Sequence, residues 1–153
     1  MSRQSKLELG PLPQMLGYAL RRAQIAVFED FGASFKPLSL RPALFSVLTL
    51  IKHNPGCKQS DAAEALGIMQ PNFVALMDEL ERRDLARRTP AKGDRRSHAL
   101  ELTEDGVALL QSADDSVVQH EARVTTSLSP SEAALLYELL ARVERSLGSL
   151  DAE

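Results

Sequence analysis

The chain has 153 residues, 44% of them hydrophobic and 25% charged, which is the composition of a globular protein and excludes a disordered one. Its net charge of −3 by itself argues against a nucleic-acid partner, and its single cysteine, Cys57, excludes an intramolecular disulfide framework and fits a reducing cytoplasm. No apolar run approaches the roughly 20 residues that span a bilayer, and residues 1–6 are not followed by the apolar core of a signal peptide, so we expect one soluble domain over residues 1–153 with no membrane partner.

A long helix is expected near the N-terminus, over residues 10–36. Pro11 and Pro13 fit its first turn, because proline is tolerated where the helix has no backbone hydrogen bond to lose. Gly32 and the Lys-Pro pair at 36–37 are expected to end it. Apolar residues recur between these limits at three- and four-residue spacing and form one stripe, which comprises Leu16, Ala19, Leu20, Ala23, Val27 and Phe31.

A second helix is expected to follow at once. Ser39 can cap it, Pro42 fits its first turn, and the run Asn54-Pro55-Gly56 stops it. Its expected buried face consists of Leu44, Val47, Leu48 and Ile51.

Two more helices are expected, a short one over residues 58–66 and a longer one over residues 70–84, joined by the tight corner Leu66-Gly67-Ile68. Two helices joined by a short turn that contains glycine form a helix-turn-helix. The expected buried side chains are Ala62, Ala63 and Leu66 in the first helix and Phe73, Leu76, Met77 and Leu80 in the second.

Residues 86–102 are expected to form a two-stranded ribbon with a basic tip, whose returning strand reaches the core through Ala99, Leu100 and Leu102. Residues 82–96 carry seven cations and two acids, whereas residues 97–122 carry six acids and neither lysine nor arginine. Because local potential rather than total charge governs the approach to phosphate, this basic strip indicates a nucleic-acid partner, with a solvated charged face as the alternative. A helix followed by a basic hairpin is the pattern of a winged helix.

Two helices are expected after the ribbon. The first begins at a Thr103 cap and carries the apolar residues Val107, Leu110, Val117, Val124 and Leu128 in a seven-residue rhythm. The second begins at Ser129, with Glu132 in the position that closes a capping box. Its seam alternates four- and three-residue steps, which favours a partner helix and hence a dimer, with a monomer that folds its two ends together as the alternative. The seam comprises Leu136, Leu140, Val143, Leu147 and Leu150.

The helix pair, the ribbon and the flanking helices together resemble the MarR family of bacterial transcription regulators over nearly the whole chain. The residues that carry the resemblance best are Gly93-Asp94-Arg95-Arg96 followed by residues 100–106, which are similar to the family's D-x-R wing running into L-T-x-x-G. Shorter matches lie at 55–59, 63–68 and 76–83. Two positions depart from the family pattern, because members often carry a basic residue near the position of Ala75 and a glycine near the position of Asp84.

The resemblance implies a mainly α fold, with a winged helix-turn-helix over residues 38–102 and with dimerisation helices over residues 10–36 and 103–150. It further implies a homodimer that binds a pseudo-palindromic operator in double-stranded DNA. The implied activity is transcription regulation, most often repression that a small ligand relieves.

The first turn of the proposed recognition helix is predicted to read bases through Gln70 and Asn72. An amide can bond adenine at two atoms in the major groove, and residues in this turn are the ones that approach base edges. The alternatives for both are helix capping and solvent exposure. Phe73 could touch a thymine methyl group, but core packing is the better prediction.

The ribbon tip is predicted to enter the minor groove through Arg95 and Arg96, since narrow A·T-rich stretches concentrate negative potential there. Asp94 and Arg96 match the family's D-x-R, in which the aspartate orients the arginine through a charge-assisted hydrogen bond. Phosphate contacts position a protein without specifying sequence. They are predicted, with solvation as the alternative for any one, for Lys58, Gln59, Arg87, Arg88 and Lys92.

Relatives commonly release DNA when a small anionic, often aromatic, molecule binds between the dimer helices and the DNA-binding region. An aromatic wall with an arginine suits an aromatic carboxylate or its thioester. The alternatives are packing for the aromatic residues and solvation for the arginines. The candidate effector-binding residues are Tyr18, Arg22, Phe28, Arg41 and Phe45.

Other kinds of site have little support in the sequence. No catalytic motif is present, so an enzyme is not expected, and no cofactor is predicted. The three histidines are widely spaced, which predicts no metal site. Cys57 precedes a helix whose N–H groups would lower its pKa, but the cysteines with which some relatives sense peroxide lie nearer the N-terminus. An alternative function of another class is a winged-helix module that binds protein and not DNA.

Overall fold

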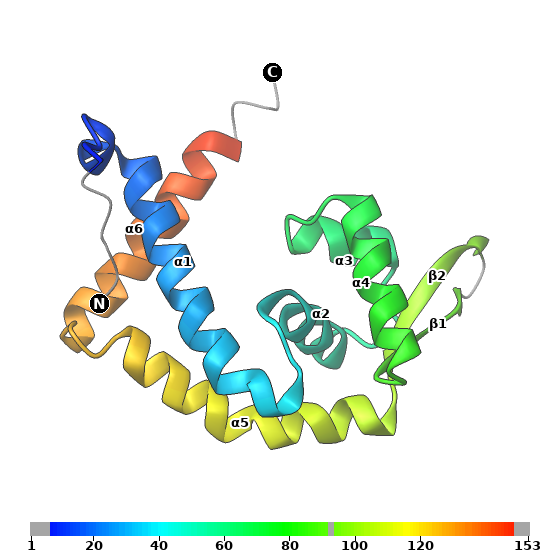
Figure 1. Ribbon diagram of the computed structural model, residues 1–153. Helices are drawn as coiled ribbons and strands as arrows, with labels where there is room; N and C mark the ends of the chain where they lie inside the picture. The colour runs from blue at the N-terminus through cyan, green and yellow to red at the C-terminus, as the bar shows by residue number, and fades with distance from the viewer. Residues whose placement is uncertain (1–6, 92–93, 149–153) are drawn as a thin grey trace. The chain divides into compact units, whose positions relative to one another are not determined.

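The computed structural model describes residues 7–91 and 94–148, and it leaves the side chains of 91–97 and 147–148 undescribed. The chain divides into two compact units, residues 1–116 and residues 117–153. Helices dominate both units, and one antiparallel sheet accompanies them in the first (Figure 1).

The N-terminal helix α1 spans Leu16–Phe35, after a short 3₁₀ turn at Leu12–Gln14. It begins later than the sequence predicted, because Met15 has extended backbone angles. Gly32 does not end the helix either. The rings of Phe31 and Phe35 are buried and stack with their centroids 3.8 Å apart, and this packing outweighs the cost of about 1 kcal/mol that glycine imposes on a helix.

Helix α2 spans Pro42–His53, with the proline in its first turn and Asn54 after its last residue, as the sequence predicted. The four residues of its predicted buried face are all fully buried. Ser39 does not cap α2. Its φ is +48°, and its N–H donates to the carbonyl of Lys36 and so closes the 3₁₀ turn η2 (Lys36–Leu38) instead of opening the next helix.

The helix-turn-helix consists of α3 (Gln59–Ala65) and α4 (Gln70–Arg82). All four predicted core residues of α4 are buried, Phe73 among them, whereas Leu66 at the end of α3 is half-buried. Asp84, two residues after α4, has a φ of +53°. This is the left-handed conformation that glycine adopts most easily and aspartate tolerates better than most residues. The stop therefore has the backbone shape that a glycine would give.

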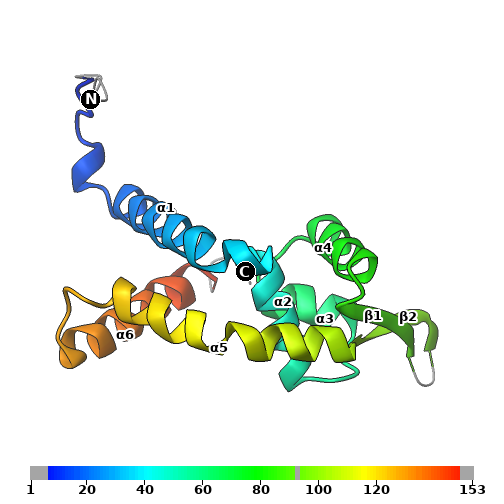
Figure 2. The same ribbon diagram turned by 60° about the horizontal axis from the view of Figure 1, so that its bottom comes forward.

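The ribbon consists of the antiparallel strands β1 (Ala86–Ala91) and β2 (Asp94–Leu102) (Figure 2). In their register Ala86 lies opposite Leu102. The segment before α3 also pairs with β2, because the N–H of Gly56 donates to the carbonyl of Leu100 at 2.8 Å and the N–H of Leu100 donates to that of Cys57 at 2.9 Å. The helix-turn-helix and the ribbon are thereby hydrogen-bonded to each other through the backbone. Ala99 and Leu100 reach the core, and Leu102 is half-buried.

Helix α5 spans Glu104–Val124 and begins against the residues that follow α4. Thr103 caps it as predicted: the N–H of Gly106 donates to the Thr103 hydroxyl at 3.0 Å, and that hydroxyl donates to the carbonyl of Asp84 at 2.6 Å. Gly106 approaches the backbone so closely that a Cβ on it would lie 1.9 Å from the Leu85 carbonyl oxygen. The helix ends before Leu128, which the sequence placed on the same helix.

Helix α6 spans Pro130–Gly148 and lies in the second unit. Its predicted capping box is formed, because the Ser129 N–H donates to the Glu132 carboxylate at 2.8 Å and the Glu132 N–H donates to the Ser129 hydroxyl at 3.3 Å. The hydroxyl and the N–H of Ser129 hold the pKa of Glu132 below its usual value. Several large apolar side chains of α6 are exposed in the single chain, namely Leu135, Leu136, Tyr137, Leu139 and Leu140.

The elements define a mainly α winged helix, as the sequence predicted. Among the residues that the structure describes, no helix combines the length and apolarity that crossing a membrane would require.

Candidate nucleic-acid interface

The start of α4 leaves its two amide side chains exposed. Met69 is the residue that precedes the helix, and its side chain makes no capping hydrogen bond. Gln70 donates from Nε2 to the carbonyl of Ser60 in α3 at 3.3 Å, which fixes it beside the neighbouring helix. Asn72 is exposed, and neither it nor Gln70 is the cap. The first turn of the helix therefore presents amide groups to the outside, as base reading requires.

Two predicted phosphate residues lie exposed at the edge of the sheet. Arg87 points away from the core with 61% of its side chain exposed, and it forms a two-pronged contact with one carboxylate oxygen of Glu101 across the ribbon, at 3.1 and 2.9 Å. Lys58 is exposed, and its backbone forms a bridge with Ala99 of β2. An exposed ion pair contributes little to stability, so Arg87 can exchange Glu101 for a phosphate at small cost.

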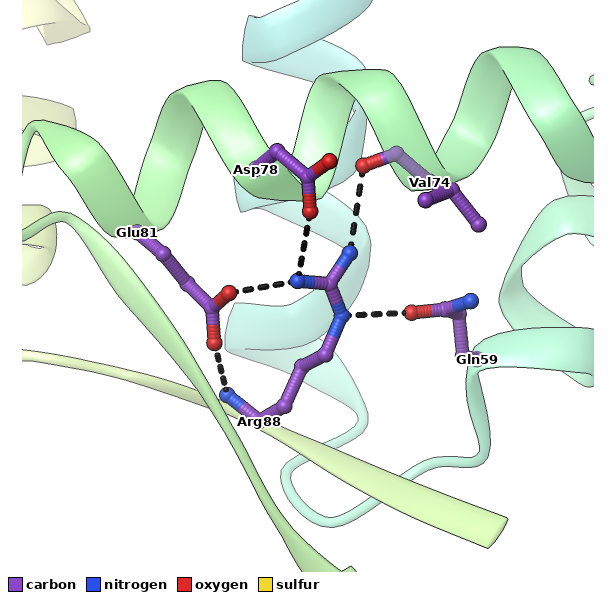
Figure 3. A network of polar contacts seen from close by, with 5 residues as sticks. All are labelled: Gln59, Val74, Asp78, Glu81 and Arg88. Carbon is purple, nitrogen blue, oxygen red and sulfur yellow. Dashed lines mark hydrogen bonds and ion pairs between the residues drawn. The ribbon is translucent and has the colours of Figure 1, made fainter.

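Arg88 and Gln59, also predicted to bind phosphate, are bonded to each other instead. Arg88 Nε donates to Gln59 Oε1 at 2.7 Å (Figure 3). Only 15% of the Arg88 side chain is exposed. Its other donors reach α4, where they bind Asp78, Glu81 and the carbonyl of Val74. The sequence missed this cluster. The signal that could have found it is the strand's period of two, which places Arg88 on the same face as the buried Ala86.

The ribbon tip carries the remaining predicted contacts. Lys92 lies outside the described residues, and so do the side chains of Asp94, Arg95 and Arg96. The backbone of β2 begins at Asp94, so these three residues belong to the far end of the ribbon from α5. Their predicted contacts with the minor groove stay predictions.

Four of the five candidate effector residues fall into two groups. Phe45 lies with its ring centroid 5.7 Å from that of Phe31 and 5.8 Å from that of Phe35, so it belongs to an aromatic cluster at the C-terminal end of α1. Phe28 lies one turn earlier on α1 and is half exposed. Tyr18 and Arg22 lie on the first half of α1, and ten residues, or about 15 Å of helix, separate Tyr18 from Phe28.

Arg41, the fifth candidate, contacts the recognition helix directly. Its guanidinium pairs with Glu79 of α4, and Glu79 also lies 3.9 Å from Arg83. Arg83 in turn donates to the carbonyl of Ser39 at 2.8 Å and to that of Leu38 at 3.3 Å. These residues tie the middle and end of α4 to the chain that joins α1 to α2. The sequence did not predict this link.

Cys57 is partly buried, and burial raises the pKa of its thiol above the ordinary value, more than a backbone hydrogen bond lowers it; the carboxylate of Asp61 raises it further. The expected lowering of its pKa by helix N–H groups is therefore wrong. A raised thiol pKa disfavours the reactive thiolate. The described side chains include no cluster of three metal-ligating residues.

These features define the class of protein: a winged helix with exposed amides on its recognition helix and a basic ribbon beside it. Comparison with known proteins agrees. A family model described as "MarR family" matches residues 39–97. A curated relative, a putative transcriptional regulatory protein for the hcr operon of Thauera aromatica, is 32% identical over 142 residues, which cover 92% of this chain and 86% of that protein.

Solved structures add to this. The transcriptional repressor CouR bound to a 23-mer DNA duplex is 48% identical, with a TM-score of 0.84, and the match covers 92% of this chain and 99% of that one. CouR bound to p-coumaroyl-CoA is 46% identical, with the same TM-score and the same coverage. The chain belongs to the MarR family, whose members are DNA-binding transcription regulators that act as dimers.

Proposed function

We propose that the protein is a sequence-specific DNA-binding repressor that a small anionic ligand releases from its operator. The observation that carries this proposal is how the helix-turn-helix (α3 and α4) and the ribbon (β1 and β2), together called the reading head, are joined. Exposed amides stand at the start of α4, and backbone hydrogen bonds and the Arg88 cluster fix the basic ribbon beside that helix. The CouR structures with a DNA duplex and with p-coumaroyl-CoA support both halves of the proposal.

Each DNA-contacting residue has a proposed role. Gln70 and Asn72 read base edges in the major groove. Arg95 and Arg96 enter the minor groove, with Asp94 orienting Arg96. Phosphate contacts come from Lys58, Arg87 and Lys92. Gln59 and Arg88 are bonded to each other, so we propose no phosphate contact for either of them.

The active form is proposed to be a homodimer that acts as one regulator on a pseudo-palindromic operator. The exposed apolar side chains of α6 support this, because a row of leucines on a helix favours burial against another chain. The dimerisation helices are proposed to lie within residues 10–36 and 103–150, on either side of the DNA-binding region at 38–102. Such a protein acts in the cytoplasm, where the DNA is.

The ligand is proposed to be an aromatic carboxylate or its thioester, and Arg41 offers a way to couple its binding to DNA release. Arg41 is exposed over 55% of its side chain and is held by Glu79 of the recognition helix. An anionic group on the ligand competes with Glu79 for Arg41, because both are acceptors for the same guanidinium. Loss of this pair removes one of the contacts that tie α4 to the chain between α1 and α2.

No observation favours the alternative of a winged-helix module that binds protein alone, and no catalytic role is proposed. Retention on heparin that depends steeply on salt distinguishes a DNA-binding regulator from a module that binds protein alone, since only a protein that binds phosphate must show it.

The test of DNA binding uses a duplex enriched by the wild-type protein from a random-sequence pool, and a shuffled duplex of the same length. Gln70→Ala and Asn72→Ala are each expected to cost about 1–3 kcal/mol on the enriched duplex and little on the shuffled one. Arg96→Ala is expected to cost affinity on the enriched duplex, and the double variant Asp94→Ala/Arg96→Ala to be no worse than Arg96→Ala alone. A wild-type protein that enriches no sequence refutes the proposed function.

The test of release adds p-coumaroyl-CoA to the preformed complex. We expect the ligand to release the enriched duplex at a ligand concentration that leaves the affinity for the shuffled duplex unchanged. Retention of the enriched duplex at saturating ligand contradicts this choice of ligand but leaves DNA binding intact.

A further inference from the structure

Arg88 forms the densest polar cluster among the described residues of the reading head (Figure 3). Nε donates to Gln59 Oε1 at 2.7 Å, Nη2 to the carbonyl of Val74 at 3.1 Å, and Nη1 to Asp78 Oδ1 at 2.9 Å. Nη1 also pairs with the Glu81 carboxylate. Four of the five N–H donors of a guanidinium are therefore used. One N–H remains, and the guanidinium cannot turn to a phosphate without giving up bonds that it already makes.

The partners of Arg88 come from both helices of the helix-turn-helix. Gln59 is the first residue of α3, and the other three lie along α4. The backbone N–H of Arg88 also donates to Glu81 Oε1 at 2.8 Å, so Glu81 holds both the main chain and the side chain of this strand residue. One residue of β1 thus joins the ribbon to α3 and to α4.

The charges of the cluster argue against a phosphate contact. Asp78 and Glu81 lie on the recognition helix, and Arg88 is the cation that balances them. If Arg88 turned to a phosphate, Asp78 and Glu81 would lose the cation that balances them, and two uncompensated carboxylates on the recognition helix would repel the DNA backbone. Arg87, its neighbour in the chain, has neither constraint: its side chain is 61% exposed and pairs only with Glu101 in the described part of the chain.

We propose that Arg88 is a positioning residue for sequence recognition: it fixes the ribbon to the recognition helix so that the two meet the duplex in one set geometry. This inference rests on the proposed DNA binding. Base reading requires the amides of α4 and the arginines of the ribbon tip to fit adjacent grooves together, and a joint of several hydrogen bonds to one planar group restricts their relative motion.

The experiment compares Arg88→Gln and Glu81→Gln with the matched control Arg87→Gln. For each we measure the dissociation constants for the enriched and the shuffled duplex at several salt concentrations, well below the thermal melting temperature of the variant. Arg88→Gln and Glu81→Gln are both expected to lower the ratio of specific to non-specific affinity by roughly fivefold or more, the value of one base contact. Arg87→Gln is expected to weaken both duplexes by the same factor and to reduce the salt slope by about one unit.

The direction in which Glu81→Gln changes the ratio of specific to non-specific affinity distinguishes a positioning role of Arg88 from a phosphate contact. If Arg88 binds phosphate, loss of Glu81 frees it, and both duplexes bind more tightly with an unchanged or higher ratio; this result overturns the proposal. A positioning role predicts a lower ratio and a double variant Arg88→Gln/Glu81→Gln that is no worse than Arg88→Gln alone. If Arg88→Gln does not fold, Glu81→Gln and Asp78→Asn give the same decision. A merely structural role lowers the melting temperature but leaves the ratio unchanged, which also overturns the proposal. A wild-type protein with no preference between the duplexes refutes DNA recognition itself.

Discussion

Gly106 lies where α5 begins against the end of the recognition helix, and Gly106→Ala tests this junction. The new Cβ would lie 1.9 Å from the Leu85 carbonyl oxygen, whereas real Cβ contacts stay above 3.0 Å. The first turn of α5 must therefore move by about 1 Å or more. This movement strains the hydrogen bond of the Thr103 N–H to Leu85 and that of the Thr103 hydroxyl to Asp84.

The expected loss follows from these contacts. Overpacking costs about 1–3 kcal/mol, and each lost hydrogen bond adds about 1 kcal/mol, so we expect the free energy of unfolding to fall by about 3–5 kcal/mol. The melting temperature of a chain of this size then falls by roughly 10 °C.

Urea unfolding at one fixed protein concentration measures the change, because the stability of a dimer depends on concentration. The control is Gly32→Ala in α1, where a Cβ meets nothing within 4 Å and alanine favours the helix by up to about 1 kcal/mol. A Gly106→Ala variant that loses less than about 1 kcal/mol, the mean effect of a substitution, would show that the junction is not tight.

Three further changes test other parts of the structure. Leu140→Asp puts a charge on the exposed apolar face of α6, and we expect sedimentation to show less dimer, whereas Glu144→Asp on the same helix keeps the wild-type value; equal dimerisation of both variants contradicts the proposed interface. Asp84→Gly is expected to be more stable to urea than Asp84→Ala by about 1 kcal/mol, since only glycine adopts the observed φ without strain, and equal stabilities oppose this explanation. The Ser129 hydroxyl and N–H lower the pKa of Glu132, so the stability that this carboxylate confers is complete above its unfolded-state pKa and is lost as pH falls through the lower folded-state pKa. Ser129→Ala keeps the N–H but removes the hydroxyl, so it should raise the pKa of Glu132 in an NMR titration, and an unchanged pKa excludes the hydroxyl as a cause.

Repetitive patterns in the sequence predicted much of the fold. The helical spacing of Leu44, Val47 and Leu48 identified the buried face of α2, because a helix packed on one side must repeat its apolar residues every three or four positions. The caps at Thr103 and Ser129 were also predictable, since the groups that cap a helix end lie within a few residues of it. One error arose where tertiary packing outweighed local preference, as Phe31 and Phe35 do at Gly32, and another where the local backbone closed a 3₁₀ turn at Ser39 in place of a helix cap.

The candidate site was less predictable, because charge in a sequence does not show which cations are free. Arg87 and Arg88 are neighbours of the same type, yet they point to opposite faces of β1: one is exposed beside Glu101, and the other is held by α3 and α4. The partners of Arg88 lie 7 to 29 residues away in the chain, and only the fold brings them together. Gln70 and Asn72 were found because their place at a helix start follows from local rules.

The contacts of Thr103 and Gly106 fix the first turn of α5 against the residues that follow the recognition helix, so a small rotation there becomes a large displacement along the helix. The helix has 21 residues and is about 31 Å long, so a tilt of about 10° displaces one end relative to the other by roughly 5 Å. Successive base pairs are about 3.4 Å apart, so a rotation of a few degrees amounts to a full step along the duplex. Because Gly106 packs directly against the Leu85 carbonyl, the first turn of α5 cannot tilt without moving the end of the recognition helix, and we expect even a small tilt to change how the protein fits its operator.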